Sequence, residues 1–167
     1  MWLIKIVLTA GICVLIWWSL TTPEQGLMAE LTAFGTGPAA VVALLFLGAV
    51  VLYARDLYRL MQVIKPADRA APPQSVWLML LIPLNFVEDF WIVAHVSASL
   101  RAEARNHPPR VWSGGGLWSG WGWCALQIGS LVPHPLGSLA GMLALPLWLW
   151  HWRLVVRARA DILAARR

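Results

Sequence analysis

The chain has 167 residues, of which 59% are hydrophobic and only 13% are charged, with a formal net charge of +5. About a quarter of the residues in soluble domains are charged, so this composition excludes an ordinary soluble fold. The basic residues flank apolar runs and no groove-reading motif is present, which favours anionic lipid headgroups over nucleic acid as their partner. The length and composition together predict one all-α integral membrane domain.

Two apolar runs open the chain. The first, residues 2–20, is longer than a signal-peptide core and is followed by a poor cleavage site, so we expect an uncleaved membrane anchor. Within it, Lys5 is expected to extend to the cytoplasmic surface. The second run, residues 38–54, is followed by Arg55 and Arg59. Both runs are predicted to cross the bilayer.

The distribution of charge predicts the orientation. The segment between the first two runs, residues 21–37, contains Glu24 and Glu30 but no Lys or Arg, whereas the other hydrophilic segments carry the basic residues. Cytoplasmic loops collect Lys and Arg. We therefore expect a multi-pass protein of the bacterial inner (cytoplasmic) membrane, with both termini in the cytoplasm.

The third apolar run, residues 76–100, would place the basic segment after it outside the cell if it crossed completely. Pro83 cannot continue a helix. Asn85 is a good N-cap and Glu88 is its capping-box partner. One helix is thus expected to end near Ile82 and a second to follow Asn85. The pattern predicts a re-entrant or interfacial helical hairpin, with an ordinary kinked span as the alternative.

The last two apolar runs, residues 117–131 and 138–152, are predicted to form a transmembrane hairpin, which brings the number of spans to about four. The basic tail, residues 153–167, is expected to lie against the inner leaflet as a helical extension. Small residues at four-residue spacing allow close helix packing in lipid: Gly116 and Gly120, Ala125 and Gly129, and Gly137 and Gly141.

Tryptophan is abundant, with 12 residues. Aromatic side chains form belts at membrane surfaces, and two groups fall where the last hairpin would meet the cytoplasm: Trp118, Trp121 and Trp123, and Trp148, Trp150 and Trp152.

The candidate ligand or ion site follows Pro83. Acidic residues at membrane depth are costly and point to function. Helical geometry places a set of polar residues on one face, the acidic stripe, with Asp89 beside it: Asn85, Glu88, His95, Ser99 and Glu103. Such a face could line a water-filled cavity, bind a cation or relay protons. In the structural alternative, Glu88 only caps its helix and Asp89 pairs with Arg55 or Arg59.

Other chemistry has little support in the sequence. His95 and His151 could both lie near the cytoplasmic surface, where facing histidines can ligate a haem or another tetrapyrrole, but no spacing motif accompanies them. Cys13 and Cys124 lie in apolar runs without metal-ligand spacing and are expected to be small buried hydrophobes. No catalytic or metal motif is present, so we predict neither an enzyme nor a resident cofactor.

From about residue 50 onward, the order of features resembles a family of small bacterial membrane proteins known only as a domain of unknown function. The resemblance implies a fold and no activity. It departs after Asn85, where a further proline is usual. The matching residues are Tyr58-Arg59, Trp77, Ile82-Pro83, Asn85, Glu88, Trp91, Trp121, Trp123 and Val156-Arg157.

Three functional hypotheses follow. The first is a non-enzymatic accessory or assembly subunit that works through lipid contact and packing against other membrane proteins. The second is ion, proton or small-ligand handling through the acidic stripe. The third is a small haem-binding electron carrier.

Overall fold

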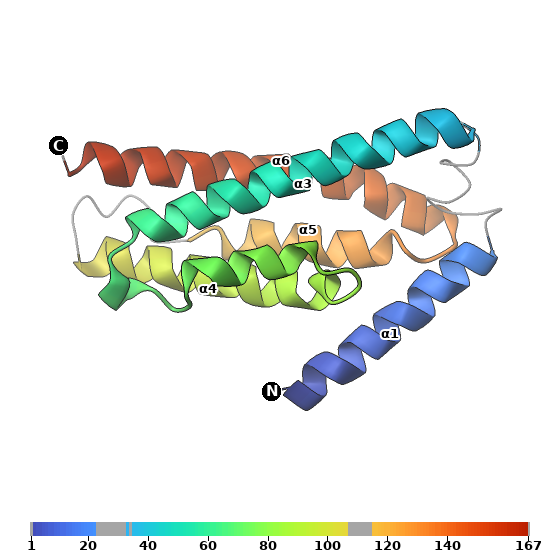
Figure 1. Ribbon diagram of the computed structural model, residues 1–167, viewed down its shortest axis with the longest axis horizontal. Coiled ribbons are helices and arrows are strands. Elements are labelled where there is room, and N and C mark those ends of the chain that lie inside the picture. The colour runs from blue at the N-terminus through green and yellow to red at the C-terminus, as the bar shows by residue number, and fades with distance from the viewer. Residues whose placement is uncertain (1, 23–32, 34, 107–114, 167) are drawn as a thin grey trace.

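The computed structural model describes residues 2–22, 33, 35–106 and 115–166, and all regular structure within them is helical. Predictions that concern Glu24 and Glu30 lie outside these residues. The helices, shown in Figure 1, are α1 (Trp2–Thr21), α3 (Thr36–Val63), the short 3-10 helices η1 (Pro66–Asp68) and η2 (Pro73–Leu80), α4 (Asn85–Asn106), α5 (Leu117–Gly129) and α6 (Pro135–Ala164).

Three helices are long and apolar enough to cross a membrane: α1, α3 and α6. They contain the predicted spans 2–20, 38–54 and 138–152. The predicted span 117–131 corresponds to α5, which has 13 residues and a length of about 20 Å, whereas the hydrocarbon core is about 30 Å thick. The chain is therefore an all-helical protein with three candidate spans, and the fourth predicted span is not confirmed.

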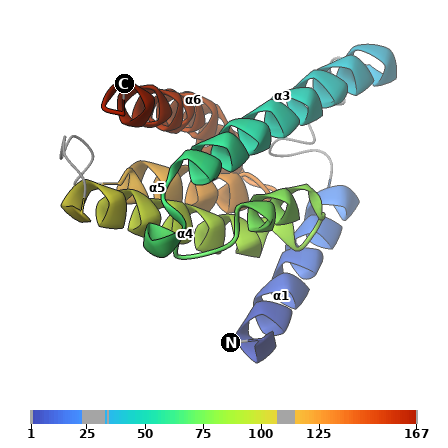
Figure 2. The same cartoon turned by 60° about the vertical axis from the view of Figure 1, so that its left-hand side comes forward.

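The helices α3, α4, α5 and α6 pack as a bundle, and α1 lies to one side of it. α3 and α6 run in the same direction, and α5 runs in the opposite direction against α6 (Figure 1). α4 packs antiparallel to α5. α1 contacts mainly α4, and it remains separate from α3 and α6 when the molecule is turned (Figure 2).

The chain reverses at the predicted break. η2 runs along α4, the chain turns between Leu80 and Asn85, and α4 returns in the opposite direction (Figure 1). The Ile82–Pro83 peptide in this turn is cis. The first arm is a 3-10 helix that ends at Leu80, not an α-helix that continues to Ile82. The insertion of this hairpin into the membrane stays a prediction.

The predicted capping box at the start of α4 is wrong. The Asn85 and Glu88 amides donate to the carbonyls of Leu81 and Leu84, at 2.8 and 3.0 Å. Because the preceding turn supplies these acceptors, the first amides of the helix need no side-chain cap. The Asn85 Oδ1 atom is buried without a partner, and the Glu88 carboxylate binds Lys5 instead.

An aromatic core replaces part of the predicted tryptophan belt. Tyr53 of α3, 1% exposed, packs with Trp123, Trp148 and Trp152 at ring-centroid distances of 5.5–6.0 Å. Edge-to-face aromatic pairs at this range are attractive. Other tryptophans do lie on the surface: Trp118 and Trp150.

Small residues let α5 approach its neighbours, as predicted. A Cβ atom added to Gly129 would lie 3.4 Å from the Ala140 Cβ of α6. At Gly120 an added Cβ atom would collide with Val93 of α4 and lie 3.0 Å from the His151 ring of α6. The contact at Gly120 therefore requires a glycine, whereas Gly129 has room for a Cβ atom at ordinary van der Waals distance.

The tail forms a helical extension, as predicted, because α6 continues without a break to Ala164. Arg166 donates to the Val63 carbonyl at the end of α3, and the position of the tail against the inner leaflet stays a prediction. Cys124 is buried as expected, whereas Cys13 is exposed on α1, a helix whose sides are mostly uncovered.

Candidate functional site

The first element of the candidate site is an ion pair that joins α1 to α4. The Lys5 Nζ atom lies 2.6 and 2.8 Å from the two carboxylate oxygens of Glu88. The side chains are 13% and 5% exposed. The Lys5 ammonium also lies 5.8 and 5.6 Å from the ring centroids of Trp2 and Trp91. Lys5 therefore binds within the protein, contrary to the prediction that it extends to the membrane surface.

The middle of the predicted polar face is tied to the linker after α3. The Ser99 hydroxyl accepts a hydrogen bond from the Ala70 amide at 2.9 Å and donates to the His95 carbonyl at 2.7 Å. His95 itself is half-buried. This part of the face thus serves to hold the chain between η1 and η2 against α4.

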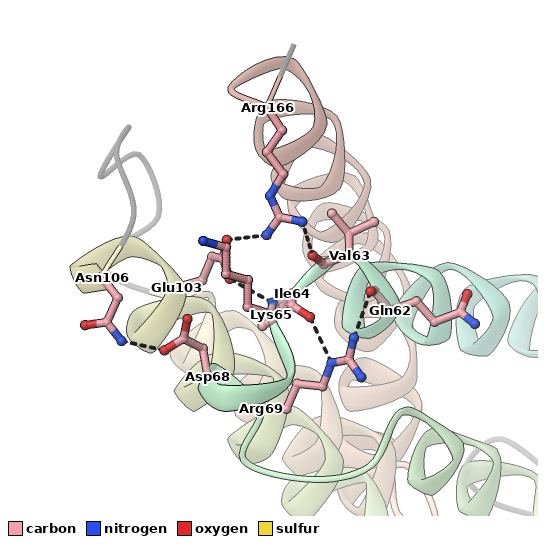
Figure 3. Close-up of polar contacts among 9 residues, drawn as sticks. All are labelled: Gln62, Val63, Ile64, Lys65, Asp68, Arg69, Glu103, Asn106 and Arg166. Atoms are coloured by element: carbon pink, nitrogen blue, oxygen red, sulfur yellow. Dashed lines mark hydrogen bonds and ion pairs between the residues drawn. The ribbon is translucent and has the colours of Figure 1, made fainter.

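At the far end of α4, Glu103 joins three segments (Figure 3). Its carboxylate accepts hydrogen bonds from the Lys65 amide at 3.0 Å and from the Arg166 guanidinium at 2.6 Å. The same guanidinium donates to the Val63 carbonyl at 2.6 Å. A carboxylate and a guanidinium form strong, directional bonds. The ends of α3, α4 and α6 are consequently held together.

A second set of contacts in Figure 3 closes the end of α3. Arg69 donates to the carbonyls of Ile64 and Gln62, each at 2.9 Å. The last carbonyls of a helix otherwise lack partners. Asn106 donates to Asp68 close by. These contacts join the end of α3, η1 and α4, which indicates a structural role.

Residues of the acidic stripe thus bind other segments of the same chain and stabilise the fold. Glu88, Ser99 and Glu103 each contact a different neighbouring segment. The sequence indicates their common face, but their partners are distant in the chain.

Asp89 differs from the rest of the predicted site. Its side chain is in the core, it is 3% exposed, and its Oδ1 atom has no hydrogen-bond partner. Burial raises the pKa of this carboxyl well above its ordinary value, and the neighbouring Glu88 raises it further. The ion pairs of the described residues do not join Asp89 to Arg55 or Arg59, and Arg55 is exposed, so this pairing stays a prediction.

The neighbours of Asp89 are residues that sequence reasoning missed. Its carboxyl interacts electrostatically with Tyr53 and Cys124. Tyr53 contacts Trp123 through an edge-to-face arrangement at 6.0 Å. In the sequence, these residues sit in apolar runs and look like ordinary packing or belt residues. The available signal was Tyr53, near the end of the apolar run 38–54, because the hydroxyl of a buried tyrosine needs a partner.

The predicted haem histidines are not brought together. The His151 Nδ1 atom lies 3.0 Å from the Ser119 hydroxyl, which donates to the Gly116 carbonyl at 3.0 Å. His151 packs beside Val93 across Gly120, and His95 is two residues further along α4, about 200° around the helix. Within the described residues, no group of three or more His, Cys, Asp or Glu side chains could hold a metal ion.

Comparison with known proteins adds no assignment: no family model, no curated protein and no solved structure matches this chain.

Proposed function

We propose that this chain is a non-enzymatic accessory or assembly subunit of a larger membrane complex in the bacterial inner membrane, with both termini in the cytoplasm. The observation that carries the proposal is that polar side chains form bonds inside the protein and apolar side chains cover its outer surface. Glu88, Ser99 and Glu103 of α4 form bonds within the protein, while the long helices present apolar surfaces outward.

The shape of α1 supports this function. Only Ile12 and Ser19 are buried on this helix of 20 residues, and the Lys5–Glu88 pair fixes its N-terminal end. Along its length, α1 stays separate from α3 and α6 (Figure 2). Van der Waals packing drives helix association in lipid, and this arrangement leaves most of α1 available to a transmembrane helix of another protein.

Small residues on α1 make a close approach feasible. A Cβ atom on Gly11 would meet nothing within 4 Å in this protein, and the same holds for Gly48 on α3. Because neither glycine is needed for internal packing, substitutions at these positions probe external contacts. They form a matched pair on two different helices.

The test is a gentle-detergent pull-down from native membranes followed by mass spectrometry. We expect other membrane proteins in stoichiometric amounts with the unaltered chain and with Gly48→Leu, and their loss with Gly11→Leu. Recovery of the unaltered chain alone, or only as a self-oligomer, would contradict the accessory role. Retention of the same partners by Gly11→Leu would contradict the use of α1.

The second candidate, ion, proton or small-ligand handling, is favoured by the unpartnered and buried Asp89. Of the predicted residues Asn85, Glu88, Asp89 and His95, Glu88 already has a cation, and His95 lies about 120° around α4 from Asp89. This candidate therefore depends on Asp89 and not on the original stripe.

A further inference from the structure

Buried polar atoms without a partner follow one line through the interior. Six of them belong to residues that are at least nine-tenths buried and come from four different helices. In order from the start of α5 toward the turn before α4, they are Ser97 Oγ, His151 Nε2, Tyr53 Oη, Trp123 Nε1, Asp89 Oδ1 and Asn85 Oδ1. Buried polar groups normally have partners, so this grouping requires a physical reason.

Contacts join the first members of the line. Gly115, at the start of α5, abuts the Ser97 hydroxyl, and a Cβ atom on Gly116 would lie 3.3 Å from the His151 ring. Gly116 has a φ of 71°, a left-handed conformation that glycine adopts without strain. A cavity with room for about one water molecule lies between His151 and residues of α4, including Val96 and Leu100.

The line continues to Asp89 through aromatic residues. The ring centroids of His151 and Tyr53 are 6.2 Å apart, and those of Tyr53 and Trp123 are 6.0 Å apart. Asp89 interacts electrostatically with Tyr53. Asn85 lies one helical turn before Asp89, and residues at this spacing are neighbours on a helix.

No cation compensates Asp89 within the described part of the chain. From α1, the charged group nearest this end of α4 is Lys5, which binds Glu88. The titratable groups that face Asp89 from α3 and α5 are Tyr53 and Cys124, and His151 of α6 lies beyond Tyr53. An isolated buried carboxylate is very unfavourable, so a neutral acid is the stable form.

We propose that Asp89 is a proton-binding site, reached from the Gly115–Gly116 end of the bundle along this line of polar side chains. A proton leaves water at that end, and a carboxylate oxygen of Asp89 accepts it to give a neutral carboxylic acid. The Tyr53 hydroxyl and the His151 imidazole can each accept and donate a proton. They divide the path into shorter steps.

Infrared spectroscopy of the protein in lipid vesicles tests the site. At neutral pH we expect the C=O stretching band of a protonated carboxylic acid, which shifts in D2O and disappears in Asp89→Asn. Asp56→Asn is the matched control, because Asp56 accepts a hydrogen bond from the Trp152 indole at 2.8 Å and should not contribute to the band. If Asp89→Asn does not fold, loss of the band from the unaltered protein at high pH provides the same test.

Two results would overturn the proposal. One is the absence of such a band at neutral pH, or its persistence in Asp89→Asn. The other is its disappearance when Na+ replaces choline as the cation, which would assign the site to a metal ion.

The path is tested by the rate at which the band shifts after transfer to D2O. Tyr53→Phe keeps the ring but removes the hydroxyl, and it should slow this exchange at least about tenfold. Unchanged exchange in Tyr53→Phe would overturn the path. These measurements concern one chain by itself, so they are independent of the pull-down that tests the accessory role.

Discussion

At the scale of single residues, Glu88 and Asp89 have different surroundings because their side chains point in different directions. Glu88 and Asp89 are consecutive, and consecutive residues on a helix point about 100° apart. Glu88 consequently reaches Lys5 on α1, whereas Asp89 enters the core between α3 and α5. One carboxylate is compensated by a cation and the other requires a proton.

Removal of Lys5 should destabilise the fold. Lys5→Met leaves the Glu88 charge buried without its partner, which we expect to lower the free energy of unfolding by about 3 kcal/mol. Thermal unfolding in detergent, followed by tryptophan fluorescence, measures the change. The double variant Lys5→Met with Glu88→Gln should lose less than the sum of the two single variants, and strict additivity would contradict a direct pair.

Asp89 should make stability depend on pH. Because its pKa is raised in the folded state, the folded protein retains a proton that the unfolded chain releases. The free energy of unfolding should therefore fall as pH rises from the ordinary carboxyl pKa toward the folded pKa, by about 1.4 kcal/mol per pH unit. Asp89→Asn should lose this slope and Asp56→Asn should keep it. Parallel pH profiles for all three proteins would contradict the assignment.

At the scale of whole elements, glycines determine the position of α5. It is the shortest of the α-helices described in full, and it lies between α4 and α6 because its glycines allow both to approach. Gly120 faces Val93 on one neighbour and His151 on the other. The packing of α5 thus depends more on the small volume of its glycine residues than on polar contacts.

Gly120→Ala should force these helices apart. The added methyl group overlaps Val93, and overpacking of this kind should cost about 2 kcal/mol in the free energy of unfolding. Gly48→Ala is the matched control, since its Cβ atom meets nothing within 4 Å. We expect that control to be neutral or slightly stabilising in thermal unfolding. Equal effects of the two variants would contradict the role of close packing.

At the scale of the whole molecule, the fold has two distinct ends. One end carries the Glu103 and Arg69 network together with the end of α6 (Figure 3). The other end carries the turn before α6, where the His134 side chain accepts a hydrogen bond from the Leu136 amide at 3.1 Å. The charge rule assigns the first end to the cytoplasm.

Cysteine labelling tests this orientation. In a Cys13→Ala background, Arg105→Cys should react with an impermeant thiol reagent only in inside-out vesicles. Leu136→Cys, at the opposite end, should react only in intact cells. Both positions are exposed, so burial does not limit the reaction. The reverse pattern would contradict the proposed topology.

The sequence predicts what depends on local pattern. Long apolar runs identify α1, α3 and α6, and Pro83 predicts the break before α4. Partners distant in the chain are not predictable in this way. Lys5 and Glu88 are 83 positions apart, and no periodicity connects them. Tyr53 resembles any interior aromatic residue until the helices assemble around it.

The Lys5–Glu88 pair also orders events during synthesis. Lys5 emerges from the ribosome before Glu88, which follows 83 positions later. During that interval the ammonium has no carboxylate, so α1 cannot take its final place until the hairpin that carries Glu88 arrives. α1 is consequently fixed in place only after α3 and the start of α4 have been made, and a chain truncated before residue 88 should leave the Lys5 amine open to modification.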